Sequence, residues 1–268
     1  MNRGFVILAQ NTKDTNYVKC AETLATSIKR VMPNESVTLI SNDSSMCQAF
    51  DNVVELPYGD LSPDSDWKLI NDWQVYEASP YDYTIKLEAD LYIPKDISYW
   101  FDVLSQRDIV VSTTIRNFKN EISKVRFYRK FIDDNNLPDC YNAITYFKKS
   151  ETAKKFFELV KDIFNNWEEY KTIVKCNPNE TATTDFVYAI ASHILGEEIT
   201  TMPNFTDMSM IHMKQYIAGT PTENWTDTLV YECFNDHIRV LTYPQMYPFH
   251  YQIKSFSDKI MKGMSNGR

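Results

Sequence analysis

The sequence predicts an α/β protein, with a mixed, mostly parallel sheet flanked by helices in a single domain that spans residues 1–268. The first observation is a strand, a helix and a second strand in succession between residues 4 and 41, which is a βαβ unit. The second is that apolar runs continue to alternate with segments of helical periodicity. The third is composition: 43% of the 268 residues are apolar, 14% are aromatic and six are glycine, so the chain can bury one large core and contains no flexible linker.

The βαβ unit begins with a short apolar run, Gly4 to Ala9, that is typical of a buried strand. Asp14 or Thr15 is placed to cap the helix that follows, and Pro33 ends it. The helix itself is predicted from apolar residues at helical spacing, namely Tyr17, Cys20, Ala21, Leu24, Ile28 and Val31. Ser36 to Ser41 forms the second strand, and such a unit implies parallel strands joined by a right-handed crossover.

Further elements follow in the same alternation. Strands are expected at residues 53–56, 84–88, 108–113 and 141–147, and helices at residues 66–78, 99–106 and 184–195. Ser150 caps another helix, whose apolar side carries Ala153, Phe156, Phe157, Val160, Phe164 and Trp167. The stretch 115–139 is expected to be irregular. The C-terminal third is aromatic and rich in loops, and its pattern predicts no order of elements.

Charge and cysteine content argue against several classes of protein. The formal net charge of −8 weighs against a protein that coats nucleic acid. The five cysteines are scattered and never spaced as CxxC, which predicts reduced thiols and no zinc site. No apolar run approaches the length of a membrane span, and the N-terminus lacks the basic region and cleavage site of a signal peptide. We therefore expect a cytoplasmic protein that does not enter a membrane.

Two carboxylates, Glu88 and Asp90, stand where a buried strand ends. Ile85 and Leu87 alternate with polar residues in period two, and Pro94 prevents further ladder pairing. Ligands of open α/β sheets bind beyond the carboxyl ends of the strands. The pair therefore either holds a divalent cation or is solvated in a loop. The chain has neither a GxGxxG nor a GxxxxGK[ST] motif, so a bound nucleotide would need a metal ion to neutralise its diphosphate.

Several short motifs resemble those of the GT-A glycosyltransferases. They are AQNT after the first strand, LISND at the end of the second, and the acid-x-acid pair. CYNAITYFKKSETAKKFF and TTDFVYAIA are similar to the acceptor-side strand and helix of the glycogenin-like branch. DWKLINDWQVYEASPYD and FHYQIK are closer still to glycosyltransferases of large tailed phages, which include enzymes that put arabinose on hydroxymethylcytosine in DNA. The resemblance covers nearly the whole chain and implies a GT-A, Rossmann-like fold, with a nucleotide-sugar half over residues 1–95 and an acceptor half over residues 96–268.

The resemblance implies a metal site. The family pattern is Asp-x-Asp, so Asp90 is the expected direct ligand of Mn²⁺ or Mg²⁺, while Glu88 departs from the pattern and its direct contact is in question. A late histidine completes the shell in the glycogenin-like branch, and His212 and His250 are the two candidates. Each is followed by a lysine, Lys214 or Lys254, that would neutralise the departing phosphate. Either histidine could equally be structural.

The resemblance also implies a nucleotide pocket in the first half of the chain. Gln10, Asn11 and Thr12 form the loop after the first strand, and Tyr17 is available to stack on the base or to face the core. The expected uracil or ribose contacts are Asn42 and Asp43, and the stretch expected to face the donor contains Trp67, Lys68, Asn71 and Trp73. Trp73 could equally anchor the core.

On the acceptor side, Asp185 is the main candidate. In an inverting reaction it would take the acceptor's proton, and in a retaining one it would orient hydroxyl groups. It could also be only a favourable first-turn helix residue. Asn142 would bond the sugar or a turn.

The segment from Arg116 to Lys130 is basic and has interleaved aromatic residues, which is typical of nucleic-acid contact but also of a solvated surface. The function that the resemblance implies is a metal-dependent transfer of a sugar, with arabinose as one candidate, from a UDP-sugar to 5-hydroxymethylcytosine in phage DNA. The alternatives are a glycan or protein acceptor, or a binding module without catalysis.

Overall fold

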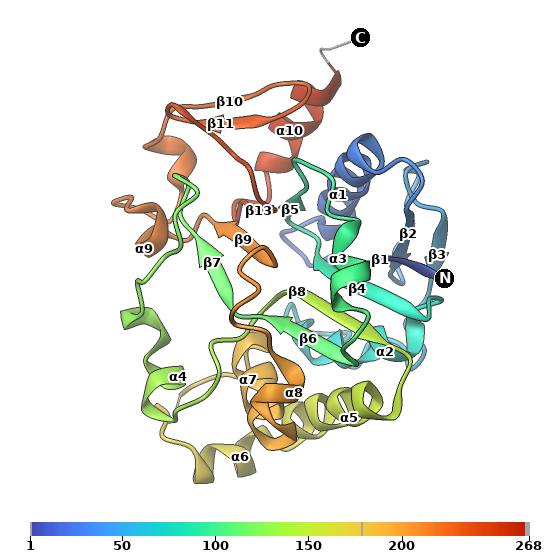
Figure 1. Cartoon of the computed structure of the whole chain (residues 1–268), viewed down its shortest axis with the longest axis vertical. Helices are drawn as coiled ribbons and strands as arrows, with labels where there is room; N and C mark the ends of the chain where they lie inside the picture. The colour runs from blue at the N-terminus through green and yellow to red at the C-terminus, as the bar shows by residue number, and fades with distance from the viewer. Residues whose placement is uncertain (1, 178, 266–268) are drawn as a thin grey trace.

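The computed structural model describes residues 2–177 and 179–265, with a six-stranded sheet at its centre (Figure 1). The strand order is β3-β2-β1-β4-β8-β6. These strands are β1 (Arg3–Leu8), β2 (Ser36–Ile40), β3 (Asn52–Val54), β4 (Tyr83–Glu88), β6 (Ile109–Ser112) and β8 (Tyr141–Lys148). β3, β2, β1 and β4 are parallel, and β8 runs antiparallel between β4 and β6. The sheet is mixed and mostly parallel, as the sequence predicts.

Helices cover both faces of this sheet, because successive strand residues point to opposite sides. Phe5 and Ile7 of β1 belong to one core cluster with α1 (Tyr17–Val31) and α3 (Tyr99–Leu104). Val6, between them, belongs to a second cluster with α5 (Glu151–Asn165) and α7 (Thr184–Leu195). Strands buried on both faces give continuous apolar runs such as the one that predicted β1.

A smaller sheet continues from the carboxyl end of the central one. Its order is β5-β13-β9-β7, with β5 (Leu91–Tyr92), β7 (Thr114–Arg116), β9 (Ser209–His212) and β13 (Phe249–His250). β5 follows β4 after two residues, Ala89 and Asp90, and β7 follows β6 after Thr113 alone. Two chain segments therefore pass from one sheet into the other, with β8 between them in the central sheet and β13 and β9 between them in the smaller one.

The C-terminal part, which the sequence did not order, forms a third cluster around a buried tryptophan, Trp225. Its elements are α9 (Gln215–Ala218), the 3₁₀ turn η3 (Trp225–Asp227), a three-stranded antiparallel sheet of β10 (Tyr231–Cys233), β11 (Ile238–Val240) and β12 (Tyr243–Pro244), and α10 (Phe256–Ser265). β10, β11 and α10 lie together at one end of the molecule, beyond the smaller four-stranded sheet (Figure 1).

Four predicted details are wrong. Asn16 caps α1, since its side chain accepts the backbone N–H of Lys19, and neither Asp14 nor Thr15 does so. Residues 66–78 form the 3₁₀ helix η1 (Leu69–Gln74) followed by α2 (Val75–Ala78). The stretch 115–139 is not wholly irregular, because it contains part of β7, η2 (Phe127–Arg129) and α4 (Lys130–Asp134).

The fourth correction concerns Trp167, which begins a separate helix, α6 (Trp167–Ile173), after a break at Asn166. Ser150 caps α5 as predicted, accepting the backbone N–H of Ala153. α7 lies at the predicted residues and is followed by α8 (Glu197–Thr200). All five cysteines are free, and within the described residues we find no helix long and apolar enough to cross a membrane.

Candidate active site

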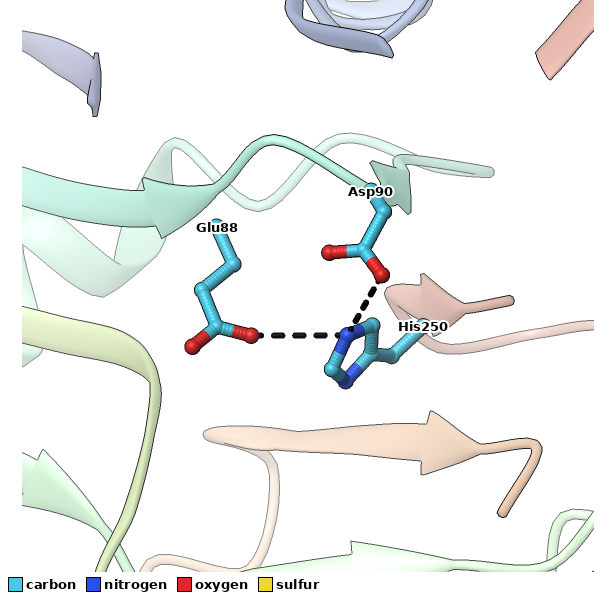
Figure 2. Close-up of side chains that lie close together, drawn as sticks. All are labelled: Glu88, Asp90 and His250. Atoms are coloured by element: carbon cyan, nitrogen blue, oxygen red, sulfur yellow. Dashed lines mark ion pairs between the residues drawn. The ribbon is translucent and has the colours of Figure 1, made fainter. Parts of the chain in front are cut away.

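The acid pair lies between the two sheets, and His250 completes it. Glu88 is the last residue of β4, and Asp90 lies in the turn before β5. β13 pairs with β5 so that His250 lies opposite Leu91. His250 Nε2 is 3.0 Å from Asp90 Oδ2 and 3.4 Å from Glu88 Oε2 (Figure 2). One ligand atom from each residue lies within 4.8 Å of the others. Two carboxylates and an imidazole are a donor set that fits Mn²⁺ or Mg²⁺.

The charges of Glu88, Asp90 and His250 act on one another at close range. Burial alone would raise the pKa of Asp90, but the His250 imidazole and the Lys254 ammonium, which contacts the carboxylate, hold that pKa below its usual range. Burial raises the pKa of Glu88 in spite of His250, and the charge of Asp90 adds to the rise. Positive groups therefore already compensate Asp90, and a divalent cation would serve the same purpose.

His212 lies next to His250 and is not a member of the group of three. The two Nδ1 atoms are 3.1 Å apart. Burial, and then the charge of His250, lower the pKa of His212 well below its usual value, so His212 is neutral. The two rings are close enough for one Nδ1 to donate to the other, and the Gln252 amide lies 3.3 Å from both Nδ1 atoms. His250 Nε2 then faces the carboxylates with its orientation fixed.

A cavity of about 310 Å³ opens beside the acid pair, and we refer to it as the first pocket. It lies at the carboxyl ends of β1 and β4, where an open α/β sheet binds its ligands. Predicted residues that line it are Gln10, Thr12, Tyr17, Trp67, Lys68, Glu88, Asp90, Asn142 and Lys254. Lys254 also lies over the ring of Tyr17, with Nζ 5.5 Å from the ring centre. The sequence thus predicts a large part of this wall.

Three predicted nucleotide contacts support the loops instead of lining the pocket. The carboxylate of Asp43 accepts the backbone N–H of Asn11 at 2.8 Å. Asn11 in turn accepts the N–H of Val18 at the start of α1. Asn42 accepts the N–H of Leu56 at 3.1 Å. These contacts fix the conformations of the loops after β1 and β2.

Asn71 and Trp73 are also not among the residues that line the first pocket. Asn71 is buried and donates to Gln10 Oε1 at 2.8 Å and to Asp60 Oδ1 at 2.7 Å, so it holds a pocket residue in place. Trp73 is buried against Tyr58, with ring centres 5.1 Å apart, and belongs to the core cluster that includes α5 and α7. The core interpretation of Trp73 is the one that fits its position.

Lys68 reaches the first pocket from a loop that it also stabilises. Its ammonium lies 2.6 Å from Asp60 Oδ2 and 2.6 Å from the carbonyl oxygen of Ser62. Burial opposes ionisation of Asp60, but the hydrogen bonds from Lys68, the Ser62 amide and Asn71 lower its pKa to about 2. The loop is therefore held by a charged pair at neutral pH.

Lys86 and Asp72 are pocket residues that the sequence analysis missed. Lys86 is in β4, buried on the side of the sheet that faces α7, and its Nζ lies 2.6 Å from Asp72 Oδ1 and 2.8 Å from Asn142 Oδ1. Asp72 also accepts the Tyr188 hydroxyl at 2.5 Å. An ammonium can only donate, so Oδ1 of Asn142 faces Lys86 and its NH₂ group faces Glu88, 3.5 Å away. Lys86 thus orients an amide donor toward the first pocket.

A second cavity of about 230 Å³ adjoins the first at Glu88, which lines both. The predicted residues Asp185, His212, Lys214 and His250 line this second pocket. Its wall also contains residues that the sequence did not single out, among them Tyr141, Phe186, Met210 and Gln252. Two pockets that meet at one carboxylate could hold two molecules in reach of each other.

Both oxygens of Asp185 are already hydrogen-bonded. Oδ1 accepts the backbone N–H of Asn142 at 2.9 Å, and Oδ2 accepts from Arg129 Nη1 at 2.9 Å. Arg129 is buried and also pairs with Asp139. Lys214 lies over the ring of Tyr128 at 4.9 Å. The contacts of Asp185 are those of a residue that fixes the start of β8.

The basic stretch is largely neutralised within the protein. Arg116 is buried and donates to Ser209 and to two backbone carbonyls. The other engaged cations and their partners are Arg126 with Asp133 and Asp139, Arg129 with Asp139 and Asp185, and Lys130 with Asp134. Lys119 and Lys124 are the exposed cations that remain of the predicted six. Arg116 and Arg129 are therefore directed inward, while Arg126 and Lys130 are paired at the surface.

Comparison with known proteins identifies the fold. No protein-family model and no curated protein matches the sequence. Among solved structures, the galactosyltransferase LgtC in complex with donor and acceptor sugar analogs aligns over 74% of this chain and 72% of its own, with a TM-score of 0.50 and 11% identity. The fold is that of a GT-A glycosyltransferase.

Other glycosyltransferases match less well. Mouse xyloside xylosyltransferase 1 aligns over 76% of this chain and 85% of its own, with a TM-score of 0.47 and 10% identity. GlyE of Streptococcus pneumoniae TIGR4 has a TM-score of 0.46 and 12% identity over 75% of this chain, which spans 45% of GlyE. Identities this low report the fold and nothing finer. The resemblance to the glycogenin-like branch and to phage enzymes stays a prediction.

Proposed function

We propose that the protein is a nucleotide-sugar-dependent glycosyltransferase whose donor, most simply a UDP-sugar, binds in the first pocket. The observation that carries this proposal is the group of Glu88, Asp90 and His250 on the edge of that pocket. It lies at the carboxyl end of β4, in a fold shared with a galactosyltransferase that was solved with donor and acceptor sugar analogs. A pocket without a glycine-rich phosphate loop needs such a group to accommodate a diphosphate.

The three residues would hold Mn²⁺ or Mg²⁺, which when bound supplies positive charge to the diphosphate of the donor. Lys254 adds a second positive charge beside Asp90, suited to the phosphate that leaves. Tyr17, on the same wall, offers an aromatic face to the base. Asn142 presents its NH₂ group next to Glu88 and would donate to a hydroxyl or the glycosidic oxygen of the donor sugar.

The acceptor would enter the second pocket. Its hydroxyl oxygen would bond to the anomeric carbon, the bond from that carbon to the phosphate oxygen would break, and UDP would leave with that electron pair. Glu88, the carboxylate common to both pockets, would remain a metal ligand, and the acceptor's proton would leave with the departing phosphate. Asp185, with both oxygens engaged, would position Asn142 and not act as the base.

The finer predictions rest on the phage resemblance alone. These are arabinose as the sugar and 5-hydroxymethylcytosine in DNA as the acceptor. The burial of Arg116 and Arg129 favours a different acceptor, because it leaves fewer cations of residues 116–130 free to contact DNA phosphates. A cytoplasmic location is part of the proposal and is supported by five free cysteines.

A donor screen tests this function. The protein is incubated with Mn²⁺ and each of UDP-glucose, UDP-galactose, UDP-xylose and UDP-arabinose, and release of UDP is measured with and without a hydroxymethylcytosine oligonucleotide. We expect slow, Mn²⁺-dependent release of UDP from one donor in the absence of acceptor. UDP binding with no release from any donor would support the non-catalytic module, and absence of UDP binding would contradict the proposal altogether.

A further inference from the structure

Three aromatic side chains meet at the mouth of the second pocket, and we refer to them as the aromatic rim. They are Phe127 and Tyr128 of η2 and Tyr216 of α9. The ring centres of Phe127 and Tyr216 are 4.6 Å apart, and those of Tyr128 and Tyr216 are 5.7 Å apart with an interplanar angle of 21°. Tyr128 lines the pocket itself. Segments almost ninety residues apart in the chain thus build one aromatic surface.

This surface is exposed, although the chain has a well-filled core. Phe127 is 67% exposed and Tyr216 is 44% exposed. Isolated apolar residues at a protein surface need no explanation, but a contiguous apolar patch at the mouth of a pocket indicates a ligand surface. Lys214 adds a cation above Tyr128 on the pocket wall. Phe127 stands at 72° to the ring of Tyr216 and at 87° to that of Tyr128, so the rim is an apolar corner with a polar group at its inner edge.

The charges around the rim limit what it can bind. Arg126 and Arg129, which flank its η2 side, are held by Asp133, Asp139 and Asp185. Lys214 is then the cation that the described residues place against the rim itself, and one ammonium group holds a polyphosphate backbone less well than a cluster would. The pocket is also small, at about 230 Å³. An uncharged ring with hydroxyl groups matches these properties better than a nucleic acid.

We propose that the aromatic rim is the binding subsite for the sugar ring of a neutral glycoside acceptor. The C–H face of the sugar lies against Phe127 and Tyr216, since its weakly positive hydrogens suit the negative face of an aromatic ring. The ring's reactive hydroxyl then points inward to Glu88, where the two pockets meet. This inference rests on the proposed function and names the acceptor class for the same site.

The test compares a rim variant with a matched control. The rim variant is Phe127→Ala combined with Tyr216→Ala. The control is Tyr58→Ala, which removes an aromatic residue of similar exposure, 57%, that lies against Trp73 and lines neither pocket. Phe127→Tyr serves as a conservative variant. The three positions that these variants change, Phe127, Tyr216 and Tyr58, are exposed side chains, so each protein should keep the wild-type circular dichroism.

Two measurements separate this inference from the proposed function. The first is UDP release without acceptor, which we expect to be the same in the wild type, the rim variant and the control. The second is transfer to methyl glycosides of glucose, galactose, mannose and xylose, with saturation-transfer NMR as a binding measurement. We expect the rim variant to raise the KM of the glycoside on the order of tenfold with a smaller change in kcat. The control and Phe127→Tyr should stay within about twofold.

The outcomes are distinguishable. A wild type that releases UDP from no donor contradicts the proposed function, whatever the rim does. A wild type that turns over donor but binds none of the glycosides overturns the inference, and so does an unchanged KM in the rim variant. Salt-dependent binding of a hydroxymethylcytosine oligonucleotide that is lost in the rim variant would also overturn it, since the rim would then stack on a base.

Discussion

Replacing Lys86 by methionine tests the buried network on which the first pocket depends. The side chains of Lys86 and Asp72 are 1% and 6% exposed, and their charged atoms are 2.6 Å apart. Methionine has a similar length but no charge, so the change leaves the Asp72 carboxylate buried, with a hydrogen bond from the Tyr188 hydroxyl but without its cation. Removing one member of a buried pair costs about 3–5 kcal/mol. We expect Lys86→Met to lose that much of the free energy of unfolding.

The assay is urea unfolding followed by tryptophan fluorescence and circular dichroism at pH 7. Lys148→Met is the control, because Lys148 lies in the adjacent strand β8 and pairs with Asp108 at 2.9 Å, but both side chains are about a third exposed. That pair is worth about 0–1 kcal/mol. Adding Asp72→Asn to Lys86→Met should recover part of the loss, since the buried charge is then removed. If Lys86→Met lowers the free energy of unfolding no more than Lys148→Met does, the buried network of Lys86 and Asp72 does not stabilise this part of the protein.

Three further predictions concern separate parts of the chain. Although burial opposes the shift, hydrogen bonds from Lys68 and its neighbours lower the pKa of Asp60 to about 2. The charged carboxylate therefore stabilises the fold at pH values above its ordinary pKa, near 3.8. This contribution, about 2 kcal/mol, is lost as the pH falls toward 2. In Asp60→Asn, the urea midpoint should therefore change less between pH 4 and pH 2 than it does in the wild type. An equal pH dependence in both proteins would show that Asp60 and Lys68 do not form the pair. Ser150→Ala removes the N-cap of α5 and should lower the free energy of unfolding by about 1 kcal/mol, whereas a loss near zero would mean that the cap is redundant. If residues 116–130 bind DNA, replacing both Lys119 and Lys124 by glutamine should abolish the salt dependence of that binding. The measurement is the slope of log Kd against log salt concentration. A wild-type slope well above about 2 would require phosphate contacts beyond those two lysines.

The sequence predicts the acid pair and the central sheet because both depend on local patterns. Ile85 and Leu87 alternate in period two, Pro94 limits the strand, and β4 ends at Glu88 in the structure. Local patterns could not decide which of His212 and His250 joins the acid pair. It depends on the pairing of β13 with β5, which joins residues about 160 positions apart in a region without clear periodicity.

Lys86 and the basic stretch show the same limit. In the alternation Thr84 to Leu87, Lys86 has the pattern of a residue facing solvent, but α7 covers that face and supplies Tyr188. A count of charges in residues 116–130 likewise finds the cations and not the aspartates that neutralise them. Asp185 is more than fifty residues from Arg129 along the chain. Local composition predicts which groups are present, and tertiary packing decides which of them are free.

The central claim is that Asp90, with Glu88 and His250, holds the metal that binds the donor diphosphate. Isothermal titration of UDP, with and without Mn²⁺, into the wild type and Asp90→Asn tests it most directly. We expect Mn²⁺ to tighten UDP binding to the wild type by at least tenfold and to have almost no effect in Asp90→Asn, because an amide cannot balance the charge of the cation. Equal Mn²⁺-dependent tightening in both proteins, or none in the wild type, would contradict the assignment.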